Sequence, residues 1–215
     1  MEPKRKRMTG DERRQEIIRA AMQVFSRNGF SGSTTRKIAE RAGISEAMIY
    51  NHFRSKKDLY AAIIDEKLQE GEPLYYPLVA MKNKDEPRVF AAIVSNYLRR
   101  HSEDTTFLRL LLFSALEGHE LATMFIAGPV RKFFEFLAEY IQKRTAEGTF
   151  REVNPEVAAR SLLGMIHYFV LLSEILKDES LQSVNQTEVV ETIVNIFCEG
   201  IMVKPIERED VNERN

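Results

Sequence analysis

The polar residues that could do chemistry gather in one stretch of this 215-residue chain, residues 34–59, which reads TTRKIAERAGISEAMIYNHFRSKKDL. Its second half carries a carboxylate, a phenol, an amide and an imidazole in one short helical pattern, and lysines follow. Such groups beside positive charge suit contacts with base edges and phosphates. We therefore predict a DNA-binding surface whose outward residues are Glu46, Ala47, Met48, Tyr50 and Asn51. Residues that could fix the DNA backbone around them are Thr35, Arg36, His52, Lys56 and Lys57.

Two short helices joined at Gly43 must position these residues. Thr34 and Ser45 are favourable N-caps for the two helices, and glycine supplies the left-handed conformation that a sharp turn requires. A longer helix precedes them, with a capping-box spacing at residues 9–12 and a stop signal at residues 28–29. This pattern predicts a helix-turn-helix unit, whose second short helix lies in the major groove of DNA.

Tyr50 and Glu46 each admit a second interpretation. Tyr50 follows the inward-facing Ile49 and could be a core aromatic, although contact with DNA is favoured. Glu46 repels phosphate, so it could accept a hydrogen bond from a cytosine amine or cap the helix, and capping is favoured. The run from Lys4 to Arg7 is either a disordered tail or an arm that reaches a neighbouring minor groove.

The charge distribution also favours a polyanionic partner. The formal net charge is −1, yet residues 1–60 carry 14 Lys and Arg against 7 Asp and Glu, while the remainder carries 17 against 25. A basic first quarter on an acidic body suits a protein that holds nucleic acid at one end. On charge alone, a merely solubilising surface is an equal alternative.

The rest of the composition argues against other classes of protein. The chain has four scattered histidines, a lone Cys198 in an apolar run, and no phosphate-binding glycine loop. We therefore expect no catalytic residue, metal or cofactor, and no intramolecular disulfide. A helical enzyme that uses His119, Glu120 and His167 is a remote alternative. No apolar run approaches the ~20 residues of a membrane span, and no secretory signal follows the basic N-terminus, so we expect a cytoplasmic protein.

Helical periodicity continues beyond the first sixty residues, and we recognise no strand pattern. Residues 71–87 are rich in proline and predict a loop or distorted linker. We expect further helices over approximately residues 55–67, 87–101, 105–117, 119–146 (kinked or divided at Gly128-Pro129), 156–177 and 187–202. The predicted fold is all-α. A three-helix DNA-binding domain would span residues 1–54, with a basic arm over residues 1–8, and a larger helical domain would span residues 55–215.

The opening stretch, preceded by IIRAAMQVFSRNGF, resembles the DNA-binding region of the tetracycline-repressor (TetR/AcrR) family of bacterial transcriptional regulators. EGTFREVNPEVAARSLLGMI, residues 147–166, is similar to the segment that opens the family's penultimate helix. The resemblance implies a homodimer that reads palindromic operators and has an effector pocket in its larger domain. The last two long helices would pair across the dimer axis. Positions that match the family's DNA-contacting residues are Thr35, Arg36, Glu46, Ala47, Met48, Tyr50, His52 and the phosphate-binding Lys56.

Two apolar segments, FLRLLLFSALEGHE and GMIHYFVLLSE, could line the effector pocket. Its candidate residues are Phe107, Leu111, Phe113, Glu117, Phe125, His167, Tyr168 and Leu171. The aromatic bias favours a hydrophobic or amphipathic effector. Most of these residues could equally belong to the core or to a dimer interface, and His167 in an apolar helix is more often a core histidine than a ligand.

We therefore expect a dimeric repressor that a small molecule releases from its operator. The effector would move the helix after Ser55 and so change the spacing of two recognition helices, which must match sites ~34 Å apart. The alternative is a helix-turn-helix regulator that is controlled by a protein partner or that uses no ligand.

Overall fold

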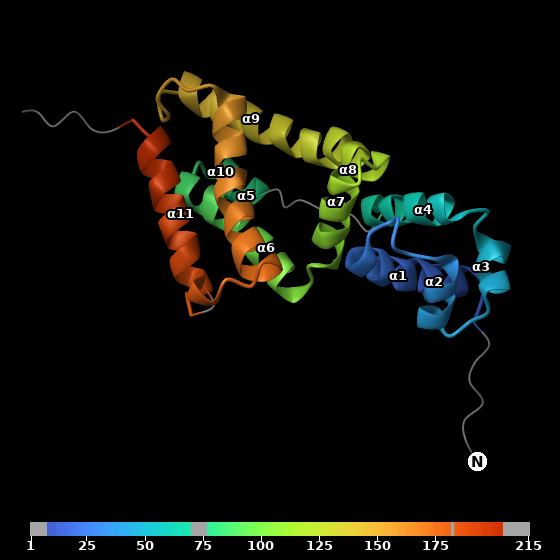
Figure 1. Ribbon diagram of the computed structural model, residues 1–215. Helices are drawn as coiled ribbons and strands as arrows, with labels where there is room; N and C mark the ends of the chain where they lie inside the picture. Colours follow the sequence, from blue (N-terminus) through green and yellow to red (C-terminus); the bar gives the residue numbers. More distant parts are fainter. Residues whose placement is uncertain (1–7, 70–76, 182, 204–215) are drawn as a thin grey trace, which may run out of the picture. The chain divides into compact units, whose positions relative to one another are not determined.

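The computed structural model describes residues 8–69, 77–181 and 183–203 (Figure 1). These residues form helices, turns and one isolated antiparallel bridge between Phe150 and Met202, so the all-α prediction is confirmed. They divide into two compact units. The first unit contains residues 8–69 and 100–131, and the second contains residues 77–99, 132–181 and 183–203.

Seven helical elements lie wholly in the first unit. They are α1 (Gly10–Asn28), α2 (Thr35–Ala42), α3 (Glu46–His52), α4 (Lys56–Gln69), α7 (Thr106–Leu116), α8 (Glu120–Phe125) and the π-helix η1 (Ile126–Val130). This unit extends past residue 54 because α1 packs against α2, α4 and α7, and α4 packs against α8. A functional boundary after residue 54 stays a prediction, and the run from Lys4 to Arg7 lies outside the described residues.

The apolar face of α1 forms the centre of the first core. Ile17, Ala21 and Phe25 are fully buried on it, as the 3.6-residue periodicity predicts. The predicted capping box begins this helix: the Glu12 N–H donates to Thr9 Oγ1 at 3.2 Å, and the Thr9 N–H donates to Glu12 Oε2 at 2.8 Å.

The second unit holds the other elements. They are α5 (Leu78–Lys82), the residues of α6 (Glu86–Glu103) up to 99, those of α9 (Arg131–Ala146) from 132, α10 (Pro155–Val170), the π-helix η2 (Leu171–Ile175), the 3-10 helix η3 (Glu179–Leu181) and α11 (Gln186–Ile201). The predicted break at Gly128-Pro129 is confirmed, because η1 separates α8 from α9 there. The linker prediction missed α5, whose five residues are too few to show a helical period.

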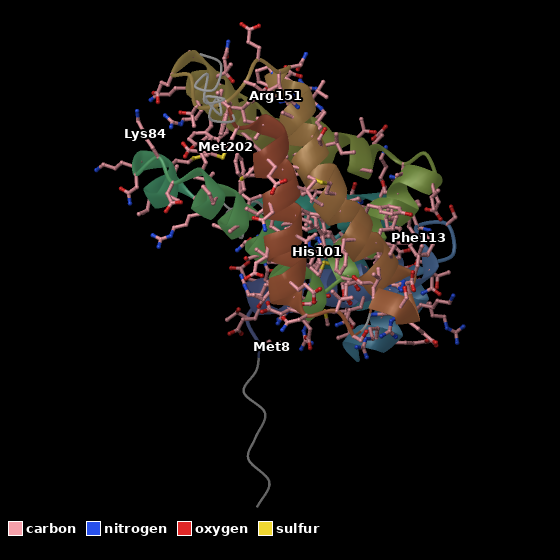
Figure 2. All side chains as sticks on the ribbon, turned by 90° about the vertical axis from the view of Figure 1, so that its left-hand side faces the viewer. Met8, Lys84, His101, Phe113, Arg151 and Met202 are labelled. Atoms are coloured by element: carbon pink, nitrogen blue, oxygen red, sulfur yellow. The ribbon has the colours of Figure 1, made fainter. Side chains whose placement is uncertain are left out.

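Main-chain hydrogen bonds join the loop between α9 and α10 to the end of α11 in the second unit. The Arg151 N–H donates to the Ile201 carbonyl at 2.8 Å, and the Val203 N–H donates to the Thr149 carbonyl at 3.0 Å. Figure 2 labels Arg151 and Met202 at this junction. Near the end of α11, Cys198 is buried, and burial raises the pKa of its thiol to about 11, which makes the thiol unreactive.

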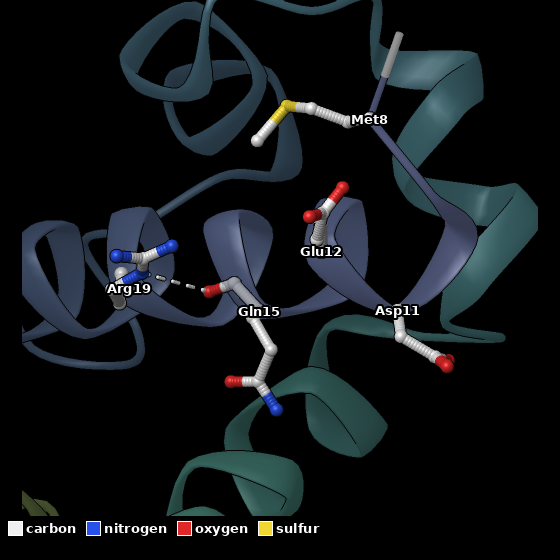
Figure 3. A pocket seen from close by; sticks show the side chains of 5 residues that line it. All are labelled: Met8, Asp11, Glu12, Gln15 and Arg19. Atoms are coloured by element: carbon white, nitrogen blue, oxygen red, sulfur yellow. Dashed lines mark hydrogen bonds between the residues drawn. The ribbon is translucent and has the colours of Figure 1, made fainter. Parts of the chain in front are cut away.

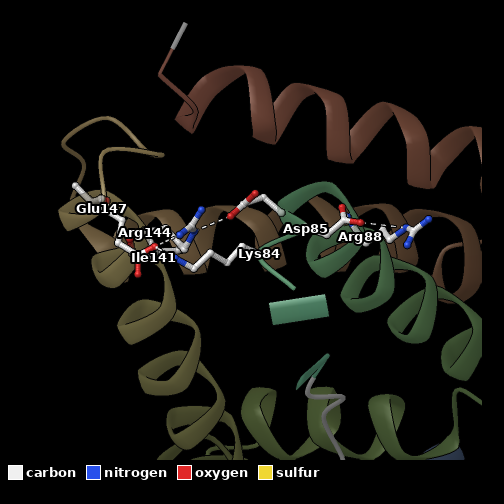
Figure 4. A network of polar contacts seen from close by, with 8 residues as sticks. Lys84, Asp85, Arg88, Ile141, Arg144 and Glu147 are labelled. Atoms are coloured by element: carbon white, nitrogen blue, oxygen red, sulfur yellow. Dashed lines mark hydrogen bonds and ion pairs between the residues drawn. The ribbon is translucent and has the colours of Figure 1, made fainter. Parts of the chain in front are cut away.

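A buried ion pair connects α6 to α9. Arg144 Nε lies 2.6 Å from Glu86 Oε1, and the two side chains are only 8% and 7% exposed. Arg144 also binds Glu147, which pairs with the more exposed Lys84 at 2.8 Å (Figure 4). Burial, followed by the charge of Glu86, raises the pKa of the neighbouring Tyr140 to about 12. Removing the Arg144 charge would therefore leave Glu86 buried without this partner, whereas Arg144 would keep Glu147 if Glu86 were removed.

The helix formed by α10 and η2 corrects one expectation. Pro155–Ile175 is 21 residues long and apolar enough, by length and composition alone, to cross a membrane, while only 22% of its most apolar window is buried. Inspection of the sequence missed it because Glu156, Arg160 and Glu174 interrupt the apolar run. A long apolar helix with a free face also fits a helix that packs against another protein chain.

We expect Arg144→Met to lower the free energy of unfolding by about 3–5 kcal/mol, because Glu86 would stay buried without a counter-charge. Urea unfolding followed by circular dichroism measures this change. Lys84→Met is the matched control and should cost less than about 1 kcal/mol, because the Lys84 ion pair is exposed. The double change Glu86→Leu with Arg144→Met should recover part of the loss. Equal stability of the two single variants would contradict a structural role for the buried pair.

Candidate nucleic-acid interface

The turn between α2 and α3 has the geometry that the sequence predicts. Thr34 Oγ1 accepts a hydrogen bond from the Lys37 N–H, and Ser45 Oγ accepts one from the Met48 N–H, so both helices begin with side-chain caps. Gly43 ends α2 in the left-handed conformation with a φ of 66°. The two helices thus meet in a sharp turn that presents α3 outward.

The recognition helix α3 is only seven residues long and buries one of them, Ile49. Phe53 follows it into the same core. The opposite face is open to solvent, with Tyr50 53% exposed and Met48 37% exposed. Glu46, Ala47 and Asn51 are also exposed. The structure therefore brings the predicted outward residues onto one free surface, and their contact with DNA stays a prediction.

Thr35 is buried beneath this surface and connects two of its residues. Its hydroxyl donates to the Glu46 carboxylate and lies 3.2 Å from the Tyr50 hydroxyl oxygen. Because the single Thr35 proton goes to Glu46, Tyr50 must be the donor in the second contact. Ser45 is the N-cap of α3, so the expectation that Glu46 caps this helix is wrong: its carboxylate binds Thr35. The sequence predicted that Thr35 contacts the DNA backbone, and it carried no signal that Thr35 would be buried.

The basic residues around α3 lie in three different settings. Arg36 is exposed and pairs with Glu40 at 3.1 Å, and His52 is half-buried at the end of the helix. Lys56 is half-buried, and its Nζ donates to the carbonyl oxygens of Phe30 and Ser33. A lysine ammonium has three protons, so one remains for a phosphate. Its predicted contact with phosphate is compatible with these bonds and stays a prediction.

The candidate pocket residues fall in both units. Phe125 is buried in the core of the first unit, and Phe107 and Leu111 pack against it. Glu117, also in this unit, accepts hydrogen bonds from the N–H groups of Phe30 and Ser31 rather than lining an identified hollow. Phe113 lies close to Gly29 on the same side of α1. Sequence reasoning missed the contacts of Glu117 because its partners are 86 and 87 residues away.

In the second unit, His167 on α10 has a specific partner on α6. Its Nδ1 lies 2.7 Å from the Tyr97 hydroxyl oxygen. Burial lowers the pKa of His167 and raises the pKa of Tyr97. Next to this pair, Tyr168 is 62% exposed and Leu171 is half-buried at the start of η2. The Tyr97–His167 pair is thus a partly buried polar contact between α6 and α10.

The hollows on the described surface lie elsewhere. One is an open depression along α1, lined by Met8, Asp11, Glu12, Gln15 and Arg19 (Figure 3). Two others lie over residues 142–155 and around Arg151 and residues 199–203. None of these three hollows contains a predicted pocket residue. Among the described residues, no group of three His, Cys, Asp or Glu side chains is placed to hold a metal ion.

Comparison with protein families finds two matches along the chain. The sequence model described as "Bacterial regulatory proteins, tetR family" matches residues 17–63. The model described as "AefR-like transcriptional repressor, C-terminal domain" matches residues 88–200, which is more than half of the chain.

Individual relatives agree with these matches. The uncharacterized HTH-type transcriptional regulator YfiR of Bacillus subtilis is 29% identical over 164 residues, 72% of this chain and 76% of that protein. The class A tetracycline repressor protein of Escherichia coli is 43% identical over 55 residues, 26% of each chain.

Solved structures share the fold. A TetR-family transcriptional regulator from Agrobacterium tumefaciens superposes with a TM-score of 0.66 at 18% identity and covers 91% of this chain and 100% of its own. AibR in complex with isovaleryl coenzyme A and operator DNA superposes with a TM-score of 0.65 at 20% identity. The match covers 86% of this chain and 97% of the AibR chain.

We expect Tyr50→Ala to weaken binding to a specific duplex about tenfold or more, because one good base contact is worth ~1–3 kcal/mol. The free energy of unfolding should change by only about 1 kcal/mol, because the half-exposed side chain loses one hydrogen bond to Thr35. Fluorescence anisotropy with labelled DNA and urea unfolding measure the two quantities. Tyr50→Phe separates the contribution of the ring from that of the hydroxyl bound to Thr35. Unchanged affinity in Tyr50→Ala would remove this residue from the interface.

Burial of His167 predicts a pH dependence of stability. Because its folded pKa is below the ordinary 6.5, the unfolded chain takes up a proton first as the pH falls, and the folded state loses stability below about 6.5. His167→Gln should reduce the difference between unfolding free energies at about pH 7.5 and about pH 5.5. Tyr97→Phe leaves His167 buried and should keep the wild-type pH slope. An unchanged slope in His167→Gln would show that other groups cause the dependence.

Proposed function

Because this chain belongs to the tetR family of bacterial regulatory proteins and is a transcriptional regulator, we propose that it represses genes by placing α3 in the major groove of a palindromic operator. The observation that carries this proposal is the short, exposed helix α3, which buries Ile49 alone and turns its other polar and apolar residues outward. A seven-residue helix with such a face contributes little to a core and suits a DNA groove.

The DNA contacts divide by chemistry. Tyr50, Asn51, Ala47 and Met48 would read base edges and methyl groups, while Glu46 holds Thr35 and disfavours phosphate at its position. Arg36 and Lys56 would supply positively charged contacts to the DNA backbone. His52, at the end of α3, would supply a peripheral contact. Thr35 would contribute from beneath, through its bonds to Glu46 and Tyr50.

The active form would be a homodimer, so that two copies of α3 meet two half-sites about one turn, ~34 Å, apart. The apolar helices α10 and α11 support this assembly, because their exposed residues include Val157 and Ile196, which are 59% and 58% exposed. Ala158, Ser161 and Gly164 add small side chains on α10 that permit close helix packing. Such a regulator would work in the bacterial cytoplasm, associated with the nucleoid when bound, without catalytic activity.

A small hydrophobic effector would release the repressor. The AibR complex supports this class of ligand, because that structure contains both an acyl coenzyme A and operator DNA. To empty an operator almost fully, the effector must prefer the released state by ~5.5 kcal/mol. A second candidate is control by a protein partner or by DNA occupancy without a ligand.

The proposal is tested by a footprint of the purified protein, at stated salt, on the DNA that flanks its own gene. We expect a protected palindrome whose half-sites are about one helical turn apart, and release on adding isovaleryl coenzyme A, the ligand in the AibR complex. Protection without release by acyl coenzyme A would favour the second candidate. Purely salt-driven binding without a protected sequence would contradict a specific operator-binding function.

A further inference from the structure

The turn between α1 and α2, residues 29–33, is bound by a carboxylate that is remote in the sequence. Glu117, the C-cap residue of α7, accepts a hydrogen bond from the Phe30 N–H at 2.9 Å and another from the Ser31 N–H at 3.3 Å. Each carboxylate oxygen binds one of two successive peptide groups, a charge-assisted arrangement that is stronger than a bond between neutral groups. This contact lies within the first compact unit.

The carbonyl groups of the same turn are bound by a positive charge. Lys56, the first residue of α4, donates to the carbonyl oxygens of Phe30 at 2.7 Å and Ser33 at 2.9 Å. Its Nζ also lies 4.1 Å from the centre of the Phe30 ring, within the range of a cation–π contact. The amide side of the turn therefore faces negative charge, and the carbonyl side faces positive charge.

Packing around the turn leaves little room for a different position. Gly29 has a φ of +69°, and a Cβ added there would overlap Glu117 Oε1. The Phe30 ring lies 4.3 Å from the centre of the His119 ring and 5.1 Å from that of Tyr60. Burial, with a smaller contribution from the charge of Glu117, raises the pKa of Tyr60 to about 12.

The position of this turn determines where α2 begins. Thr34 caps α2 immediately after the turn, and Thr35 then binds both Glu46 and Tyr50 on α3. We infer that Glu117 is a positioning residue for the DNA-binding surface, because it fixes the turn from which α2, and through Thr35 also α3, project. It acts through the turn and not through contact with DNA. This inference rests on the proposed role of α3 in binding DNA.

Charge and positioning make opposite predictions for Glu117→Gln. Removing a negative charge from a DNA-binding unit should by itself strengthen binding to a polyanion. Losing a charge-assisted acceptor should instead loosen the turn, because glutamine can accept with only one of its two terminal atoms. A fall in affinity would therefore identify positioning and exclude the simple charge effect.

The experiment compares the DNA affinity of three full-length proteins: wild type, Glu117→Gln and Glu120→Gln. The probe is the duplex that wild type protects in the footprint, or duplex chosen by wild type from a random pool. Glu120 is the matched control, because it lies in the same unit, is exposed, and pairs with Lys57. Its change therefore removes one charge without removing a contact to the turn. We expect Glu117→Gln to bind about tenfold more weakly and Glu120→Gln to bind as well as wild type or better. Equal affinity of the Glu117 and Glu120 variants would overturn the inference.

A second measurement reports on the turn without DNA. In Glu117→Gln, the amide protons of Phe30 and Ser31 should exchange with solvent faster than in wild type, while exchange in the buried part of α1 stays unchanged. Unchanged exchange at both amides would also overturn the inference. If wild type selects no duplex, the proposed function fails. The exchange of these two amides then still decides whether Glu117 holds the turn.

Discussion

The DNA-binding unit depends on one buried residue, Ile49, which anchors α3 in the core. This helix is too short to be stable alone. Isolated helices of fewer than ~12 residues are marginal in water, and α3 has seven. Its conformation must therefore come from its neighbours: the Ser45 cap, the Gly43 turn, and the core that receives Ile49 and Phe53. Because α3 buries only the face that carries Ile49, Met48 and Tyr50 on its other side stay exposed to solvent.

The same dependence extends outward from α3 in successive layers. Thr35 joins α2 to α3 through its hydroxyl, and the turn before α2 is bound by Lys56 and Glu117. Each layer satisfies peptide or hydroxyl groups with a charged partner, whereas the aliphatic core beneath supplies the burial. Polar contacts thus set direction, and apolar contacts supply most of the stability.

Features with a local signal were predictable from the sequence. The caps at Thr9, Thr34 and Ser45 and the break at Gly128-Pro129 depend on residues within a few positions, and the helices begin or divide there as expected. Contacts between distant residues have no such signal. The carboxylates of Glu46 and Glu117 bind partners that are 11 to 87 positions away.

The candidate effector pocket also could not be predicted from local sequence signals. The sequence identified an apolar segment from residue 107 onward, and Leu108 and Leu110 within it are buried. It could not tell whether the burial serves a core or a cavity, because both require the same side chains. For Phe107, Leu111 and Phe125, the structure gives the answer: they pack on the core of the first unit.

The close approach of Gly29 to Glu117 has a consequence for how this sequence can change over time. Any side chain at position 29 would need the space that the carboxylate occupies, and it would also have to adopt a left-handed backbone. The two positions are therefore not free to drift separately. A lineage that loses the glycine must also shorten or move the glutamate, so this pair links the evolutionary histories of the α1–α2 turn and the end of α7.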